Sequence, residues 1–198
     1  MFTKPQTIHG LMKQSFKTGN LYVANILGNL ALAGTGWAVI LLKTFCPNEI
    51  KAETVKLTGE LPREGQCYSA SEDGNQQSFP EAMRMNLYEE VEKRTTRELE
   101  DMLITVRGIF GTYRIYDGNP DRPIVVNEEI CQKISSKLCD EEEEIFGPCI
   151  DDNGRIYWQS NRMAFAYMET DLEKVGEKDK DAADTIWAVW KAMTGYGE

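Results

Sequence analysis

One uncharged stretch constrains this chain more than any other feature. From Leu21 to Leu42 the sequence runs for 22 residues without a charged side chain. At 1.5 Å per residue a helix of that length spans a hydrocarbon core of about 30 Å. The rest of the chain is too polar to wrap a helix that is apolar on all sides, and the run is longer than the apolar part of a cleaved signal peptide. It therefore predicts an uncleaved signal anchor, a single transmembrane helix over residues 21–45.

The same stretch predicts a helix–helix contact. Asn25 and Asn29 are four residues apart and would share one face of the helix. Lipid cannot satisfy their amide groups, whereas a neighbouring helix can, and small residues would let that helix approach closely. The alternative is that the amides reach water at the headgroups. The predicted interface consists of Asn25, Gly28, Asn29, Ala33 and Gly36.

Charge divides the chain at the end of this stretch. Residues 1–46 contain four lysines and no acidic residue, whereas the remainder contains all 32 acidic residues and 18 of the 22 basic ones. We therefore expect a basic tail at 1–20, the membrane helix at 21–45, a linker at 46–78 and an acidic domain at 79–198. So acidic a domain excludes nucleic acid as a partner, because phosphate contacts require clustered Lys and Arg.

The positions of the cysteines indicate on which side of the membrane the C-terminal domain lies, and whether it contains a disulfide. Lysines flank the apolar stretch almost equally on both sides, so the positive-inside rule gives little direction. All five cysteines follow the stretch, which favours an oxidising compartment and a C-terminal domain on the non-cytoplasmic side. Two interpretations remain open for Cys131, Cys139 and Cys149, namely a disulfide between two of them or buried free thiols.

Periodicity predicts a mainly helical domain after the linker. Apolar residues three or four apart, from a capping box at Ser78 to Tyr113, indicate one long amphipathic helix. Asn127 can cap a second helix, and residues 181–193 carry the pattern of a final helix. The turn Asp152-Asn153-Gly154 lies between apolar residues and predicts a hairpin. The expected fold class is mainly α: one N-terminal transmembrane helix followed by a mostly helical α+β soluble domain with a small hairpin.

No catalytic, cofactor-binding or metal-binding pattern is found in the sequence. The chain has a single histidine, His9, so the acidic domain lacks a Ser–His or Cys–His pair. Neither phosphate-binding glycine motif is present. The segment around Gly154 resembles part of an EF-hand calcium loop, but Cys149 and Ser160 occupy two essential ligand positions. We therefore expect no enzyme activity, no cofactor and no bound metal.

These observations favour a non-enzymatic, accessory subunit of a membrane protein complex. The setting would be a bacterial envelope machine or an organellar inner-membrane complex, with lipid, other membrane subunits or a second copy as partners. As an alternative, Lys17-Thr18-Gly19 before the apolar run resembles the processing site of type IV pilin-like proteins, which implies an anchored pilus-type subunit. The sequence departs from that family at Asn20, where a hydrophobic residue is usual, and at Ala24, where Glu is usual. A membrane-anchored enzyme is the third hypothesis.

Overall fold

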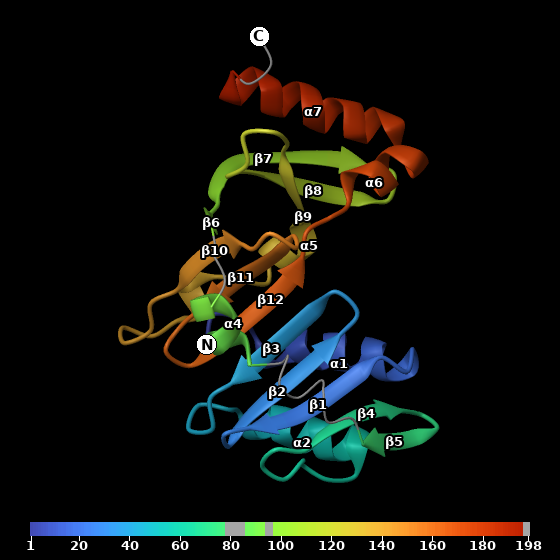
Figure 1. The fold of residues 1–198 in the computed structure, drawn as a ribbon, viewed down its shortest axis with the longest axis vertical. Coiled ribbons are helices and arrows are strands. Elements are labelled where there is room, and N and C mark those ends of the chain that lie inside the picture. Colours follow the sequence, from blue (N-terminus) through green and yellow to red (C-terminus); the bar gives the residue numbers. More distant parts are fainter. Residues whose placement is uncertain (78–85, 94–96, 196–198) are drawn as a thin grey trace.

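A large antiparallel sheet dominates the molecule. The computed structural model describes residues 1–77, 86–93 and 97–195. Nine strands of this part of the chain pair in the order β5-β4-β1-β2-β3-β12-β11-β10-β6 (Figure 1). The strands are β1 Leu21–Ile26, β2 Asn29–Gly34, β3 Trp37–Leu41, β4 Cys67–Ser71, β5 Gly74–Gln77, β6 Arg97–Glu98, β10 Phe146–Ile150, β11 Arg155–Gln159 and β12 Met163–Met168.

A smaller sheet lies beside the first, at one end of the long axis of the molecule (Figure 1). Its three strands, in the order β7-β8-β9, are Glu100–Gly108, Gly111–Asp117 and Ile124–Asn127. The helices are α1 Pro5–Lys17, α2 Asn48–Thr58, α4 Leu87–Lys93, α5 Glu128–Cys131, α6 Leu172–Lys178 and α7 Lys180–Thr194, with a 3-10 turn at Ser136–Leu138.

The predicted transmembrane helix is wrong, because Leu21–Leu42 forms the three-stranded meander β1-β2-β3. Two tight turns divide the uncharged run, one at Leu27-Gly28 and one at Thr35-Gly36. Gly28 and Gly36 both have positive φ, which a continuous helix cannot accommodate. The run is apolar on both sides because its strands lie inside a sheet that is packed on both faces.

The predictions that depended on this span are also wrong. In the described part of the chain, no helix combines the length and the apolar character needed to cross a bilayer. The single-pass membrane localisation, and the acidic domain on the non-cytoplasmic side of that span, are corrected accordingly. The mainly α fold class is wrong as well, since the described chain has more strand than helix.

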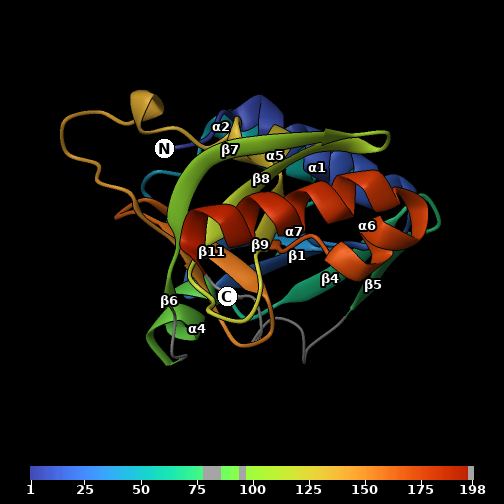
Figure 2. The ribbon, with the colours of Figure 1, turned by 90° about the horizontal axis from the view of Figure 1, so that it is seen from above.

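The segments on either side of the uncharged run are folded. Within residues 1–20, α1 buries Ile8 and Met12 against one face of the large sheet, together with Phe2. The Trp37 indole N–H donates to the Ser15 hydroxyl at 3.0 Å and so joins α1 to β3. Within residues 46–78, where we expected a linker, α2 packs beside α1 and is followed by β4 and β5 (Figures 1 and 2).

The predicted long helix after Ser78 is also wrong from Arg97 onward. Its start at Ser78 lies outside the described residues, and α4 covers seven residues of its course. From Glu100 to Asp117 the chain forms the β7–β8 hairpin instead. The three-and-four spacing of Val106, Ile109 and Tyr113 is compatible with a helix, but Val106 pairs directly with Tyr113 across the hairpin.

Three local predictions are confirmed. Asp151-Asp152-Asn153-Gly154 forms the turn between β10 and β11, and the Asp151 carboxylate accepts the Asn153 N–H at 2.9 Å. The final helix is α7. Asn127 caps α5 by accepting the Glu129 N–H, although α5 is only four residues long.

The small sheet is shared between two hydrophobic clusters. Along β9, Ile124 and Val126 belong to the main cluster between the large sheet and α1, whereas Val125 belongs to the cluster under α7. Because alternate residues of a strand point to opposite faces, β9 contributes to both clusters. A main-chain hydrogen bond of 2.7 Å from Thr170 N–H to the Val125 carbonyl joins the end of β12 to the small sheet.

Candidate protein-binding surface

The tip of the β7–β8 hairpin exposes two large apolar side chains. Gly108 pairs with Gly111, so the loop between them contains only Ile109 and Phe110. Loops of this length usually contain Gly, Asn or Asp. Here Ile109 is 81% exposed and Phe110 is 64% exposed. The geometry of the turn does not require either residue, which makes the tip a candidate contact with another molecule.

Asp179 fixes this tip to α7. One of its carboxylate oxygens accepts the Ile109 N–H, and the other accepts the Ala182 N–H at 3.2 Å as the cap of α7. Asp179 is buried, and Gly108 has no side chain that would keep it away from the hairpin. The exposed pair is therefore held on a rigid support, which lowers the entropy lost when a partner binds.

A groove runs along β7, with α7 as its second wall. Viewed from above, α7 lies alongside β7 (Figure 2). Val106 and Ala182 are buried between them and belong to the same hydrophobic cluster. The groove is lined by Ile104, Thr105, Val106, Arg107, Gly108 and Ile109 from the hairpin, and by Asp179, Asp181, Ala182, Thr185 and Val189.

A second depression lies on the other side of the tip. It is lined by Phe110 and Tyr113 of the hairpin, by Val175 of α6, and by polar residues that include Lys174 and Lys178. Burial raises the pKa of the Tyr113 phenol, and the negative charge of Asp179 raises it further. Tyr113 is therefore neutral at physiological pH. Both walls of the tip thus combine apolar side chains with charged ones.

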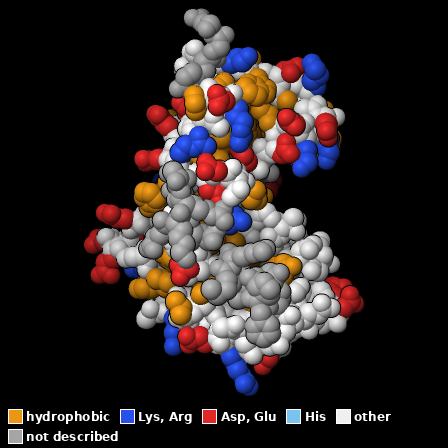
Figure 3. Space-filling view, in the orientation of Figure 1, with side chains coloured by type: hydrophobic (Ala, Val, Ile, Leu, Met, Phe, Trp, Pro, Cys, Tyr) orange, Lys and Arg blue, Asp and Glu red, His pale blue; other side chains and the backbone are white. Residues whose placement is uncertain are grey.

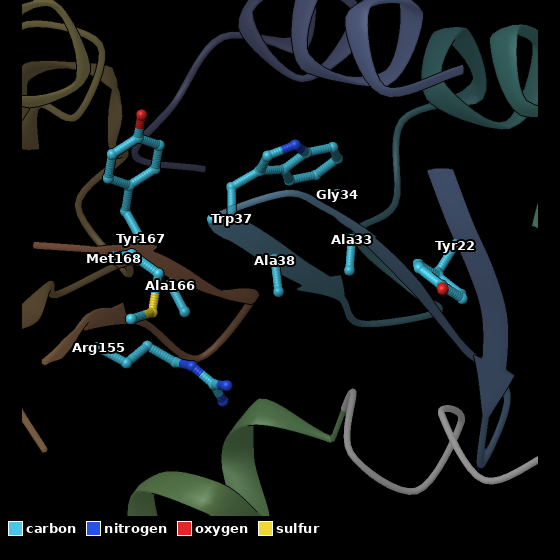
Figure 4. A pocket seen from close by; sticks show the side chains of 10 residues that line it. Tyr22, Ala33, Gly34, Trp37, Ala38, Arg155, Ala166, Tyr167 and Met168 are labelled. Atoms are coloured by element: carbon cyan, nitrogen blue, oxygen red, sulfur yellow. The ribbon is translucent and has the colours of Figure 1, made fainter. Parts of the chain in front are cut away.

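The large sheet carries a separate hollow of about 250 Å³ on the face opposite α1 (Figure 4). Its floor is a row of alanines from adjacent strands, since Ala33 pairs with Ala38 and Ala38 pairs with Ala166. Tyr22 and Arg155 stand at the two ends of this row (Figure 4). The hollow exists because the small side chains leave space above the sheet. It is smaller than the pockets that usually hold drug-sized ligands.

An acidic loop precedes β10. Figure 3 shows acidic side chains gathered at the left edge of the molecule, over the loop that leads into β10 in Figure 1. Glu141, Glu142 and Glu144 are exposed, whereas Glu143 is buried and accepts a hydrogen bond of 2.7 Å from the Ser160 hydroxyl. The N-terminal amino group of Met1 also contacts Glu143. The loop is thus anchored through the inward Glu143 carboxylate, through an ion pair between Asp140 and Arg162, and through a hydrogen bond from the Asn161 amide to the Glu142 carbonyl.

Two ion-pair groups stabilise the fold around the small sheet. Arg114 on β8 donates to both carboxylate oxygens of Glu128, at 2.6 and 2.7 Å, and to Asp101 on β7 at 2.6 Å. The Arg114 guanidinium holds the pKa of Glu128 below its usual range. Arg122 binds both oxygens of Glu169, at 2.6 and 2.8 Å. Arg122 and Glu169 form a one-to-one ion pair, whereas the single charge of Arg114 is shared by two carboxylates; in both groups the arginine binds a carboxylate through two hydrogen bonds, as is common in structural contacts.

The cysteines do not form the disulfide that we considered. All five are free, including Cys131, Cys139 and Cys149, so the disulfide interpretation is corrected. Burial raises the pKa of the Cys131 and Cys46 thiols to about 11. Both are therefore protonated near neutral pH and are weak nucleophiles. Over residues 1–77, 86–93 and 97–195, no cluster of His, Cys, Asp and Glu could hold a metal ion.

The five residues of the predicted helix interface lie at two separate places. Asn25 donates to the Pro62 carbonyl at 3.1 Å, Asn29 accepts the Lys43 N–H at 2.9 Å, and Gly28 lies in the turn between them. Ala33 and Gly36 instead line the hollow on the large sheet. The structure therefore does not bring them together as one stripe.

The sequence contained a signal for the exposed tip that periodicity obscured. Ile109 and Phe110 also fit the apolar stripe of the amphipathic helix that the spacing predicts up to Tyr113. The glycines on both sides, Gly108 and Gly111, instead mark a turn that presents these two side chains.

Comparisons with protein-family models, with curated proteins and with solved structures found no match to this chain.

Proposed function

We propose that this chain is a non-enzymatic subunit of a protein assembly and that it docks on a partner protein through the tip of the β7–β8 hairpin. The observation that supports this proposal most strongly is the exposed pair Ile109–Phe110, in which the Ile109 N–H donates a hydrogen bond to Asp179. Exposed apolar anchors on a rigid support are typical of the few residues that dominate protein–protein affinity. The net charge of −10 argues against a nucleic acid partner.

The test compares a tip variant with a matched control. Ile109→Ser/Phe110→Ser removes both anchors, whereas Leu27→Ser removes a residue that is 74% exposed at the β1–β2 turn. Wild type and both variants are produced in the native cells, extracted gently and compared by native mass. We expect wild type and Leu27→Ser in the same assembly. The double variant should be released, since losing about 2 kcal/mol at an anchor lowers affinity about thirtyfold.

Two results would contradict the proposal. If the double variant stays in the assembly as firmly as wild type, the tip is not the docking element. If wild type itself runs as a monomer under conditions that preserve known assemblies, the chain is not a stable subunit. A homo-oligomer of wild type that the double variant dissolves would identify a second copy as the partner.

A further inference from the structure

The open edge of β7 is shaped to accept an added strand. Among the described residues, β7 pairs with β8 on one side and with no strand on the other. Gly108 and Gly111 close a two-residue loop, so these two residues form a hydrogen-bonded pair. Because hydrogen-bonded and non-hydrogen-bonded pairs alternate along an antiparallel ladder, Val106–Tyr113 and Ile104–Ile115 are hydrogen-bonded pairs as well. The main-chain N–H and C=O groups of Thr105 and Arg107, which lie between these pairs, therefore point away from β8 toward the open edge.

This edge differs from the other sheet edges that the structure describes. β5 is short and polar, with four exposed residues, and β6 has only two residues. On β9, at the opposite side of the small sheet, Thr170 already donates to the Val125 carbonyl. β7 has a bulge at Leu103, where φ is 57°, but from Ile104 to Gly108 its pairing is regular. Proteins usually protect so open an edge, unless it serves as a binding site.

The groove beside this edge has side chains and main-chain groups that suit an extended chain. On the β7 side it offers the outward main-chain groups, and on the α7 side it offers Ala182, Thr185 and Val189. The exposed carboxylate of Asp181 stands on the α7 wall. An added strand would direct alternate side chains toward α7. There, apolar side chains of the added strand would pack against Ala182 and Val189, and one basic side chain would face Asp181.

We propose that an extended segment of a partner protein, with a basic residue facing Asp181, binds here as a fourth strand of the small sheet. The proposal rests on the proposed function, because it names how the partner of the β7–β8 hairpin is held. Main-chain hydrogen bonds to Thr105 and Arg107 supply affinity, and the α7 wall selects the side chains. A second copy of this chain is a less suitable occupant because two copies with a net charge of −10 repel each other.

The experiment uses a displayed library of random twelve-residue peptides as the probe. Peptides enriched on wild type are measured on Thr105→Pro, which removes the outward N–H, and on Thr105→Ala, which keeps it. Proline is tolerated on edge strands where the N–H faces solvent. We expect Thr105→Ala to bind within about twofold of wild type. Thr105→Pro should bind about tenfold more weakly, as the loss of one main-chain hydrogen bond implies.

A measurement on wild type removes the dependence on the proline variant folding. Hydrogen exchange is followed by NMR with and without an enriched peptide. The Thr105 and Arg107 amides should exchange at least tenfold more slowly with peptide, whereas Ile104 and Val106, already paired with β8, should change little. The proposal is overturned if no peptide is enriched, if the exchange at Thr105 and Arg107 is unchanged, or if wild type self-associates through this edge.

The same variants separate this inference from the proposed function. If Ile109→Ser/Phe110→Ser leaves the native assembly while Thr105→Pro stays in it, the hairpin docks by its tip alone and strand addition is wrong. If peptides bind the edge but the tip variant stays in the assembly, strand addition stands and the tip is not the anchor.

Discussion

Leu27 adopts a backbone conformation that its side chain does not favour. It has φ of 51° and is followed by Gly28 with φ of 84°, so the β1–β2 loop has two residues in the left-handed region. Such loops favour Asn-Gly, and a left-handed non-glycine residue costs about 1–2 kcal/mol. We expect Leu27→Asn to raise the free energy of unfolding by about 0.5–1 kcal/mol, measured by urea denaturation. Leu27→Val should lower it, because β-branched residues resist positive φ.

Glu128 should make stability depend on pH. Its pKa in the folded protein lies below the ordinary value of 4.5 because Arg114 hydrogen-bonds both of its oxygens. The stabilisation is therefore complete above that value and is lost as the pH falls through the lower folded-state pKa. We expect Glu128→Gln to cost about 2 kcal/mol at pH 7, since hydrogen bonds to charged groups contribute about 1.5–3 kcal/mol.

Urea denaturation at several pH values between 7 and 3 checks this prediction. The difference between wild type and Glu128→Gln should shrink steadily below pH 4.5. The neighbouring exposed Glu129→Gln serves as the control and should show a small difference at every pH. A difference for Glu128→Gln that stayed constant down to pH 3 would exclude the contribution of the ionised carboxylate.

At the scale of elements, Asp179 couples a helix to a hairpin. Asp179→Ala removes the cap of α7 and the bond to the Ile109 N–H, so we expect a loss of about 2 kcal/mol and faster exchange of the Ile109 amide. Asp171→Ala is the control, because Asp171 caps α6 through Glu173 and Lys174, whereas the Ile109 N–H donates to Asp179. That variant should cost about 1 kcal/mol and leave the Ile109 amide unchanged. Equal exchange at Ile109 in both variants would contradict the coupling.

Elements defined by local signals could be predicted from the sequence, and those defined by distant partners could not. The β10–β11 turn depends on Asp151 through Gly154, and α7 depends on its own periodic apolar residues. By contrast, β3 is completed by pairing with β12, more than 120 residues later in the chain. No local pattern contains that partner, so the uncharged run around β3 satisfied a membrane-helix pattern equally well.

The candidate site was missed for the same reason. A spacing of three or four residues placed Val106, Ile109 and Tyr113 on one helix face. In the hairpin, Val106 and Tyr113 pair and are buried, whereas Ile109 is exposed at the tip. Only the flanking glycines distinguished the two arrangements, and a glycine can also interrupt a helix.

At the scale of the whole molecule, the two sheets share their cores. Ile124 and Val126 of β9 pack with the large sheet, and Val125 packs with α7. The Thr170–Val125 hydrogen bond and the Arg122–Glu169 ion pair cross the same junction. Loss of the hydrophobic cluster under α7 would therefore uncover one face of the small sheet. The other face of that sheet packs in the main cluster, so the main cluster would lose support as well. This arrangement predicts cooperative unfolding of both parts.

Two pairs of tryptophans can report separately on the two parts. Trp37→Phe/Trp158→Phe keeps Trp187 and Trp190 on α7, and the reciprocal double variant keeps Trp37 and Trp158 in the large sheet. In each variant we expect the urea midpoint from fluorescence to equal the midpoint from far-ultraviolet circular dichroism, as a two-state transition requires. An α7 signal lost at a lower urea concentration than the circular dichroism signal would instead mean that the small sheet and α7 unfold first. In that case the hairpin would be a separately unfolding docking element, because the shared β9 layer would not hold the two clusters together.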